Sequence, residues 1–188
     1  MSTDNPGIKE DLRSFYDRDV GRRKEKEAPG WKIDYRSRFV NRCKESGCNR
    51  LLEVGSGPGR DSSYFKDNGL GPVPVDLSFE MTRACRKEGL SPVQMDTYDL
   101  GFSDNTFDCV WSLNVLLHTP KASIQSVWRE IHRVMKPGAI FFLGVYGGID
   151  HEGVYENDWN RPRRFFSRFT DEDIQQQIQS VFHLVTFE

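Results

Sequence analysis

Three glycines at alternate positions follow an acidic residue in the segment LLEVGSGPGRDSSYF, residues 51–65. Gly55, Gly57 and Gly59 carry no β-carbon, so a bound molecule can approach the backbone of this turn closely. The segment that follows is expected to be a helix, and the first N–H groups of a helix have no partner within it. The pattern therefore predicts a turn that binds a ligand through its backbone.

The glycine spacing departs from the dinucleotide-binding fingerprint GxGxxG, because the position of the third glycine holds Arg60. The pattern that remains is E-x-G-x-G-x-G, from Glu53 to Gly59. In this motif the chain resembles the class I S-adenosylmethionine-dependent methyltransferases, and the resemblance covers roughly residues 49–187. It implies that S-adenosyl-L-methionine is the cofactor.

Two further acids stand where the resemblance implies cofactor contacts. Asp76 would bind the two ribose hydroxyls, since one carboxylate suits a vicinal diol, and Asp96 would accept from the adenine amino group. Asp76 alone could cap a helix and Asp96 could be a loop acid, but the three motifs together favour cofactor binding. The residues expected at the cofactor are Glu53, Gly55, Gly57, Gly59, Asp76, Leu77, Met95, Asp96, Thr97, Ser112, Leu113 and Asn114.

The resemblance places the methionine end of the cofactor beside Ser112, Leu113 and Asn114, where the contacts would come mainly from the backbone. His118 follows shortly after and is the candidate for removing a proton from a hydroxyl acceptor, although a structural or substrate-shaping role is the alternative. The chain lacks the Asn/Asp-Pro-Pro-aromatic motif of methyltransferases that act on DNA bases. DNA is therefore disfavoured as the acceptor.

Two stretches rich in aromatic residues are expected to bind the methyl acceptor. Tyr16 and Tyr35 lie in the first, and Tyr146 and Arg164 belong to the second, around a substrate-side insertion at about residues 147–170. An equal alternative for the second stretch is a lid that packs its own aromatic side chains. A small-molecule acceptor is expected, and RNA or a protein side chain is less favoured.

The elements that would position these residues alternate between short apolar runs and helix-period segments from residue 49 onward. Strands are expected at residues 50–54, 72–75, 92–95, 107–111, 139–146 and 183–187. Helices are expected at residues 61–68, after Ser78, at 121–135 and at 171–182. The predicted fold is α/β: a doubly wound, mostly parallel, Rossmann-like sheet over residues 49–188, preceded by a helical cap at 1–48.

Composition is that of one ordinary soluble domain, with 37% hydrophobic and 29% charged residues among 188. The net charge of -2 gives no overall field that would attract nucleic acid or anionic membranes. No apolar run approaches the ~20 residues that span a bilayer, and the first residues resemble neither a signal nor a transit peptide. A cytoplasmic location is predicted.

The four cysteines, at positions 43, 48, 85 and 109, and the four histidines show no spacing typical of zinc ligands. Cys43 and Cys48 are close enough in sequence to meet, but reduced thiols are expected in the cytoplasm. No metal site is predicted.

Class I folds normally finish with an antiparallel strand, and this sequence ends before one is apparent. The expected sheet thus lacks its last strand, which leaves two hypotheses from different classes. The first is a methyltransferase that acts on oxygen or nitrogen of a small molecule. The second is a catalytically inactive or truncated S-adenosylmethionine-binding protein that regulates a partner. An NAD-linked oxidoreductase is the weakest alternative.

Overall fold

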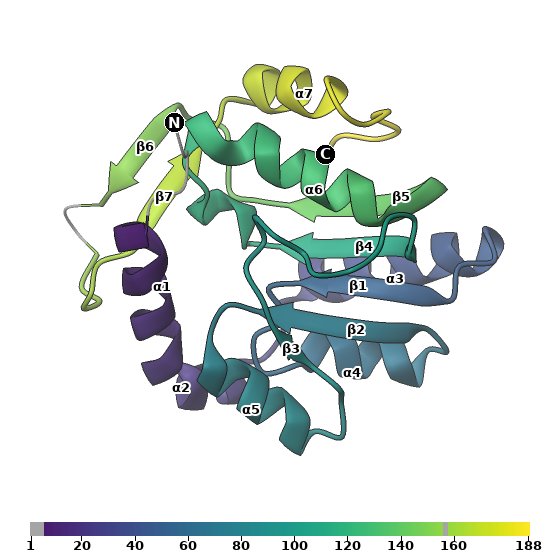
Figure 1. Ribbon diagram of the computed structural model, residues 1–188, viewed down its shortest axis with the longest axis horizontal. Helices are drawn as coiled ribbons and strands as arrows, with labels where there is room; N and C mark the ends of the chain where they lie inside the picture. The colour runs from purple at the N-terminus through teal and green to yellow at the C-terminus, as the bar shows by residue number, and fades with distance from the viewer. Residues whose placement is uncertain (1–5, 156–157) are drawn as a thin grey trace.

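A computed structural model describes residues 6–155 and 158–188 of the chain. Its central sheet has five parallel strands in the order β3-β2-β1-β4-β5 (Figure 1). The strands are β1 (Arg50–Val54), β2 (Gly71–Asp76), β3 (Val93–Gln94), β4 (Phe107–Leu113) and β5 (Met135–Gly144). The strand order reverses between β1 and β4, and ligands of doubly wound sheets bind at the carboxyl ends of the strands beside such a reversal.

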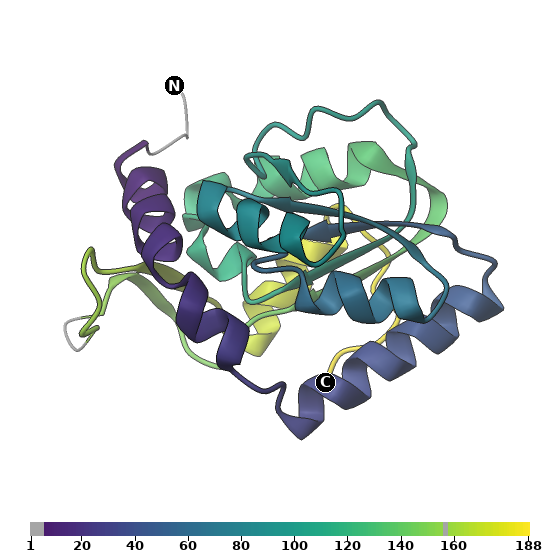
Figure 2. The same cartoon turned by 90° about the horizontal axis from the view of Figure 1, so that it is seen from below.

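Helices cover both faces of the sheet, as Figure 2 shows. One face is covered by α6 (Ile124–Val134) and α7 (Asp171–Gln179), and the other by α3 (Gly30–Glu45) and α4 (Arg60–Asp67). Because both faces are covered, strand β1 has fully buried leucines at neighbouring positions, Leu51 and Leu52. The predicted α/β sheet with helices on both faces is confirmed.

The apolar faces of two helices explain how they pack on the sheet. Five buried residues of α6 recur at helical spacing: Ile124, Val127, Trp128, Ile131 and Val134. On the opposite face, the ring of Phe39 in α3 lies 5.1 Å from that of Trp111 in β4, and Trp111 stacks on Phe142 at 4.0 Å. These contacts fix α3 against the sheet.

The remaining elements surround the carboxyl ends of the strands. They are α1 (Pro6–Arg18), α2 (Val20–Glu25) and the antiparallel pair β6 (His151–Val154) and β7 (Phe165–Arg168), whereas α5 (Phe79–Lys87) runs beside β2 and β3 (Figure 1). The Ser78 side chain accepts from the Met81 N–H and caps α5, as predicted. The division into a helical cap and a sheet domain stays a prediction. Of the three helices in the expected cap, α3 packs on the sheet, whereas α1 and α2 lie beyond the carboxyl ends of the strands.

Several expectations for the second half of the chain were wrong. Residues 183–187 form no strand; instead the C-terminal segment reaches α3, where Glu188 accepts hydrogen bonds from Arg38 and Tyr35. The helix expected at 121–135 starts as a 3-10 turn and ends at Val134, because Met135 already pairs with Phe107 as part of β5. The β6/β7 hairpin was not predicted.

No antiparallel strand joins the main sheet within the described residues, so β5 is its edge strand there. Within residues 6–155 and 158–188, no helix combines the length and the apolar character needed to cross a membrane.

Candidate functional site

A cavity of 530 Å³ opens at the carboxyl ends of the central strands, between the sheet, α1 and α3. It brings together most residues that the sequence singled out: Tyr16, Glu53, Gly55, Gly57, Asp76, Leu77, Met95, Asp96, Thr97, Leu113, Asn114, His118 and Tyr146. Four expected residues do not line it: Tyr35, Gly59, Ser112 and Arg164. These four have other surroundings, described below.

The glycine turn between β1 and α4 has left-handed backbone conformations at all three glycines. At Gly55, with φ +72°, a β-carbon would lie only 2.0 Å from a methyl carbon of Val115. At Gly57, with φ +55°, a β-carbon would meet no atom within 4 Å, so the backbone there faces open space in the cavity. Gly59 instead makes room for packing, since its β-carbon would meet Cys85 Sγ at 2.6 Å.

The carboxylate of Asp76 connects β2 to this turn. One oxygen accepts from the Gly57 N–H at 2.8 Å and the other from the Ser78 N–H at 2.9 Å. Burial raises the pKa of Asp76, and the two backbone N–H groups act against that increase. Each carboxylate oxygen keeps a further acceptor position, so the group can bind a pair of hydroxyls.

Glu53 lies deeper in the cavity wall and is 3% exposed. Its carboxyl accepts a hydrogen bond from the Ser62 hydroxyl. Burial, together with the negative charge of Asp61, raises the pKa of Glu53 well above its usual range. A substantial fraction of Glu53 is therefore protonated in the free protein near neutral pH.

Two cations on α3 reach the same part of the cavity and were missed by the sequence reasoning. Lys32 Nζ lies 2.8 Å from one Asp61 oxygen, and Arg36 Nη1 lies 3.1 Å from the other. Arg36 is 9% exposed, and its Nε has no hydrogen-bond partner among the described residues. The sequence does contain a pattern that could have identified Arg36, because this residue lies at helical spacing from the buried residues Phe39, Val40 and Cys43 of α3.

Asp96 lies on the far side of the cavity, after β3, and forms an ion pair with α1. Its carboxylate is 2.5 Å from Lys9 Nζ, and that ammonium also lies 3.9 Å from the centre of the Tyr98 ring. The other oxygen of Asp96 accepts from the Tyr98 N–H at 3.0 Å. Helix α1 is therefore attached to the loop where an adenine contact was expected.

Tyr16 and His118 meet in the wall of the cavity. The Tyr16 hydroxyl lies 2.8 Å from His118 Nε2, and His118 Nδ1 lies 2.6 Å from the backbone carbonyl oxygen of Phe165 in β7. Burial lowers the pKa of His118 to about 4, so the imidazole is neutral at physiological pH. A carbonyl can only accept; hence Nδ1 carries the ring proton, Nε2 accepts, and Tyr16 donates to it.

The expected residues outside the cavity have structural contacts. Arg164 donates to both oxygens of Asp158, at 3.1 Å and 3.3 Å, and its positive charge next to Tyr16 acts against the increase of the Tyr16 pKa that burial causes. Tyr35 lies on α3, where its hydroxyl donates to Glu188. Ser112 is completely buried within β4, and its hydroxyl has no partner among the described residues.

The cavity thus combines a backbone turn open to a ligand with carboxylates at three of its walls and two cations beside Asp61. Such an arrangement can bind a molecule that carries hydroxyls, an ammonium and a carboxylate. The neutral imidazole and the phenol in the cavity wall can orient a second molecule.

A family profile described as "Methyltransferase domain" matches residues 52–143. A sterol 24-C-methyltransferase of Aspergillus fumigatus is 36% identical over 124 residues, which are 61% of this chain and 32% of that protein. A malonyl-[acyl-carrier protein] O-methyltransferase of Enterobacter lignolyticus is 33% identical over 93 residues, 48% of this chain and 36% of that one. The chain spans about a third of the length of these curated relatives.

Among solved structures, the fold is similar to that of a 1,6-didemethyltoxoflavin-N1-methyltransferase of Burkholderia thailandensis, with bound 1,6-didemethyltoxoflavin and S-adenosylhomocysteine. The TM-score is 0.69 at 20% identity, and the match covers 95% of this chain and 81% of the other. At this identity the likeness shows a shared fold.

Proposed function

Because this chain belongs to the class I S-adenosylmethionine-dependent methyltransferases, we propose that it binds S-adenosyl-L-methionine and transfers the methyl group to a small-molecule acceptor. The observation that carries the proposal is Asp76, whose two oxygens are fixed by the N–H groups of Gly57 and Ser78 at the cavity wall. This places an oriented pair of acceptors next to a turn that a ligand can approach closely.

The residues of the cavity fit the cofactor group by group. Asp76 suits the ribose diol, and Asp96 with Met95 and Thr97 suits the adenine ring. Glu53 suits the ammonium of the methionine part. The guanidinium of Arg36 suits its carboxylate, with the Lys32 ammonium beside it. Lys9 now pairs with Asp96, so adenine binding would require that ion pair to adjust.

The cofactor, when bound, supplies a methyl group on a positively charged sulfur that leaves readily. The protein therefore has to align the acceptor with the methyl carbon and to exclude water. Helix α1 covers the cavity with Leu12 and Tyr16, and Val115 lies against Gly55 on the opposite side. These side chains form the walls of the reaction space.

The tautomer of His118 helps to predict which kind of atom of the substrate is methylated. Tyr16 gives its only hydroxyl proton to His118 Nε2, which leaves its oxygen as an acceptor in the cavity wall, beside the Arg164 guanidinium. That oxygen can accept a hydrogen bond from an O–H or N–H group of the methyl acceptor and so orient this molecule. We therefore propose methylation of oxygen or nitrogen rather than carbon. His118, with its low pKa, acts here as a positioning residue for Tyr16, not as a strong base.

Calorimetric titration with S-adenosylmethionine and S-adenosylhomocysteine tests the cofactor assignment directly. Asp76→Asn is expected to weaken both affinities by about a hundredfold, because the hydrogen bonds to a charged carboxylate are lost. Asp108→Asn is the matched control: Asp108 also accepts two backbone N–H groups, from Asn49 and Arg50, but at the other end of the sheet. Equal binding by the Asp76 variant and the wild type would refute the proposal.

A second measurement separates catalysis from binding alone. The protein is incubated with methyl-labelled cofactor and a fractionated metabolite extract, and transferred label is followed into low-molecular-weight products. Transfer supports the enzyme, whereas tight binding without transfer to any fraction would favour a binding protein without turnover. Binding of NAD in place of S-adenosylmethionine would favour an oxidoreductase. A location in the cytoplasm remains a prediction from the sequence.

A further inference from the structure

Three thiols converge at the end of the sheet that lies farthest from the cavity. They belong to Cys43 in the last turn of α3, Cys48 in the connection that follows, and Cys109 in β4. All three sulfur atoms lie within 4.8 Å of one another. Cys43 and Cys48 are near each other in the sequence, but Cys109 comes from a distant strand, so no spacing in the sequence indicates a cluster of three.

The backbone holds the three residues in this arrangement. The turn after α3 passes through Gly47, with φ +68°, and the Cys48 N–H donates to the Cys43 carbonyl at 2.8 Å. Cys109 enters from the neighbouring element, because β4 pairs with β1 in a register that sets Cys109 opposite Leu51. The cluster is thus built into the α3/β1/β4 junction.

The spacing of the sulfurs matches what a thiolate-bound ion requires. With a metal–sulfur distance of about 2.3 Å, three thiolates around one ion stand about 4 Å apart. Sulfurs within 4.8 Å therefore need only small rotations to share an ion. Soft thiolate ligands select soft ions such as Cu⁺ and Zn²⁺ over Mg²⁺ or Ca²⁺.

We propose that Cys43, Cys48 and Cys109 form a binding site for a soft, thiophilic metal ion. Cys43 and Cys109 are completely buried, whereas Cys48 is half-buried, so the ion would enter past Cys48. The nearby Asp108 carboxylate is already engaged by Lys136 and by two backbone N–H groups. Among the described residues only these three offer a ligand set, which favours Cu⁺, an ion satisfied by three sulfurs.

Each thiol of the cluster has to lose its proton to bind the ion. The Cys48 thiol donates to the backbone carbonyl of Asp108 at 3.4 Å, and the Cys109 thiol donates to that of Arg50 at 4.0 Å. Binding should therefore release protons and become tighter as pH rises.

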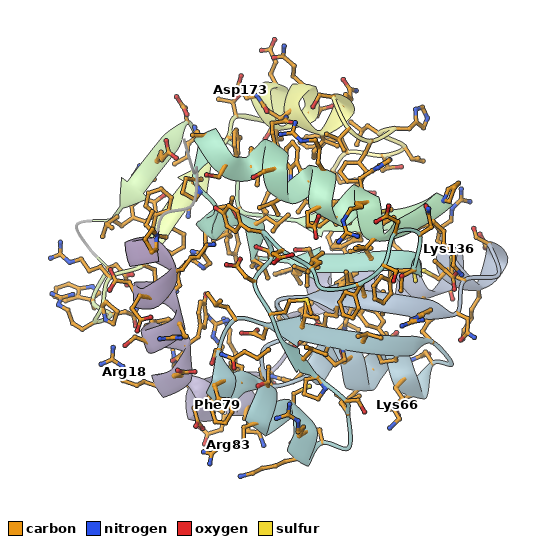
Figure 3. The ribbon with its side chains drawn as sticks, in the orientation of Figure 1. Arg18, Lys66, Phe79, Arg83, Lys136 and Asp173 are labelled. Atoms are coloured by element: carbon orange, nitrogen blue, oxygen red, sulfur yellow. The ribbon has the colours of Figure 1, made fainter. Side chains whose placement is uncertain are left out.

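The proposed ion would stabilise the fold without taking part in the reaction. Lys136, next to the cluster, lies at the opposite end of the sheet from Phe79, which begins α5 beside Asp76 (Figure 3). A metal at this junction would connect α3 to β4 and raise the melting temperature. The inference is independent of the proposed function.

The test is an anaerobic titration of the phosphine-reduced, full-length protein with Cu⁺ against a chromophoric Cu⁺ chelator. A parallel titration uses Zn²⁺ with a zinc chelator. We expect one Cu⁺ per chain, an ultraviolet thiolate-to-metal band and a higher melting temperature. Zn²⁺ should bind more weakly than Cu⁺, since it prefers four ligands.

Cys48→Ser should weaken Cu⁺ binding by more than about a hundredfold, because it removes one of three ligands. Cys85→Ser is the matched control: Cys85 is a buried thiol outside the cluster and should retain full stoichiometry. If a variant folds poorly, protection of wild-type Cys48 from alkylation by added Cu⁺ gives the same answer. No binding by the wild type, equal binding by the Cys48 variant, or a disulfide in place of a metal complex would overturn the proposal.

Discussion

The Tyr16 hydroxyl donates to Nε2 of His118 across 2.8 Å, and this contact joins the first helix to the segment after β4. The carbonyl of Phe165 fixes the other nitrogen of the ring, so the direction of the whole hydrogen-bond chain is determined. Tyr16 is thereby presented to the cavity as an acceptor. Both residues were singled out from the sequence, but their pairing was not.

Replacement of Tyr16 by phenylalanine tests this arrangement. Tyr16→Phe removes the hydroxyl oxygen but keeps the ring. The kcat/KM for the methyl-accepting substrate identified in the extract screen should therefore fall about tenfold to a hundredfold. Affinity for S-adenosylmethionine should stay within about twofold by calorimetry. Tyr35→Phe, a matched loss of a hydroxyl on α3, should leave both quantities unchanged. A uniform loss of cofactor binding in the Tyr16 variant would contradict the assigned role.

The low pKa of His118 should make stability depend on pH. The folded pKa is about 4 against an ordinary value of 6.5, so the unfolded chain binds more protons between these values. The free energy of unfolding should therefore fall by up to about 3 kcal/mol as pH drops from 6.5 to 4. Urea unfolding of the wild type and His118→Gln across this range measures the difference.

The exposed His183 supplies the control for that experiment. His183→Gln should keep the pH dependence of the wild type, while His118→Gln should have a shallower slope. Identical slopes in all three proteins would show that His118 titrates normally.

Cofactor binding should release protons from Glu53. Burial raises the pKa of Glu53, so part of it is protonated at neutral pH, and an ammonium placed beside it would favour the carboxylate. Calorimetry in buffers with different ionisation enthalpies should show net proton release at pH 7 that disappears at pH 10. Glu53→Gln should abolish it, and proton uptake by the wild type would contradict the assignment.

Two glycines of the turn should respond differently to substitution by alanine. Gly55→Ala would force a β-carbon against Val115 in a left-handed conformation and should reduce stability by about 3 kcal/mol or more. Gly57 has the same kind of left-handed backbone, but a β-carbon there would meet open space. Gly57→Ala should therefore reduce stability by only about 1 kcal/mol, while it reduces cofactor affinity more than Gly55→Ala does. Chemical unfolding and calorimetry separate the two effects; equal destabilisation would argue against the open cradle at Gly57.

Local patterns predicted well those elements whose neighbours in sequence determine them. Strand β1 matches its expected bounds because the apolar residues Leu51, Leu52 and Val54 stand directly before the glycine turn, and Ser78 was identified as a cap from its position before a helix. The segment at 183–187 has the same β-rich character but no strand partner, since the chain leads it to α3. A strand needs a neighbour, and sequence alone does not reveal whether one is present.

The candidate site shows the same division. The glycine turn, Asp76 and Asp96 lie at the ends of strands and were found by their spacing. Arg36 and Lys32 come from a helix distant in sequence, and only the packing of α3 against the sheet brings them to Asp61. Contacts between remote elements depend on that packing, which no short pattern encodes.

Helix α1 is fastened to three sides of the cavity: through Lys9 to Asp96, through Tyr16 to His118, and through Asp17 to the backbone N–H of Glu80 at the start of α5. Because residues of α1 line the cavity, a ligand as large as a nucleoside bound there would lie against this helix. We expect the bound molecule to dissociate faster when these three contacts are broken, so that the lifetime of the complex would depend on the stability of the N-terminal helix.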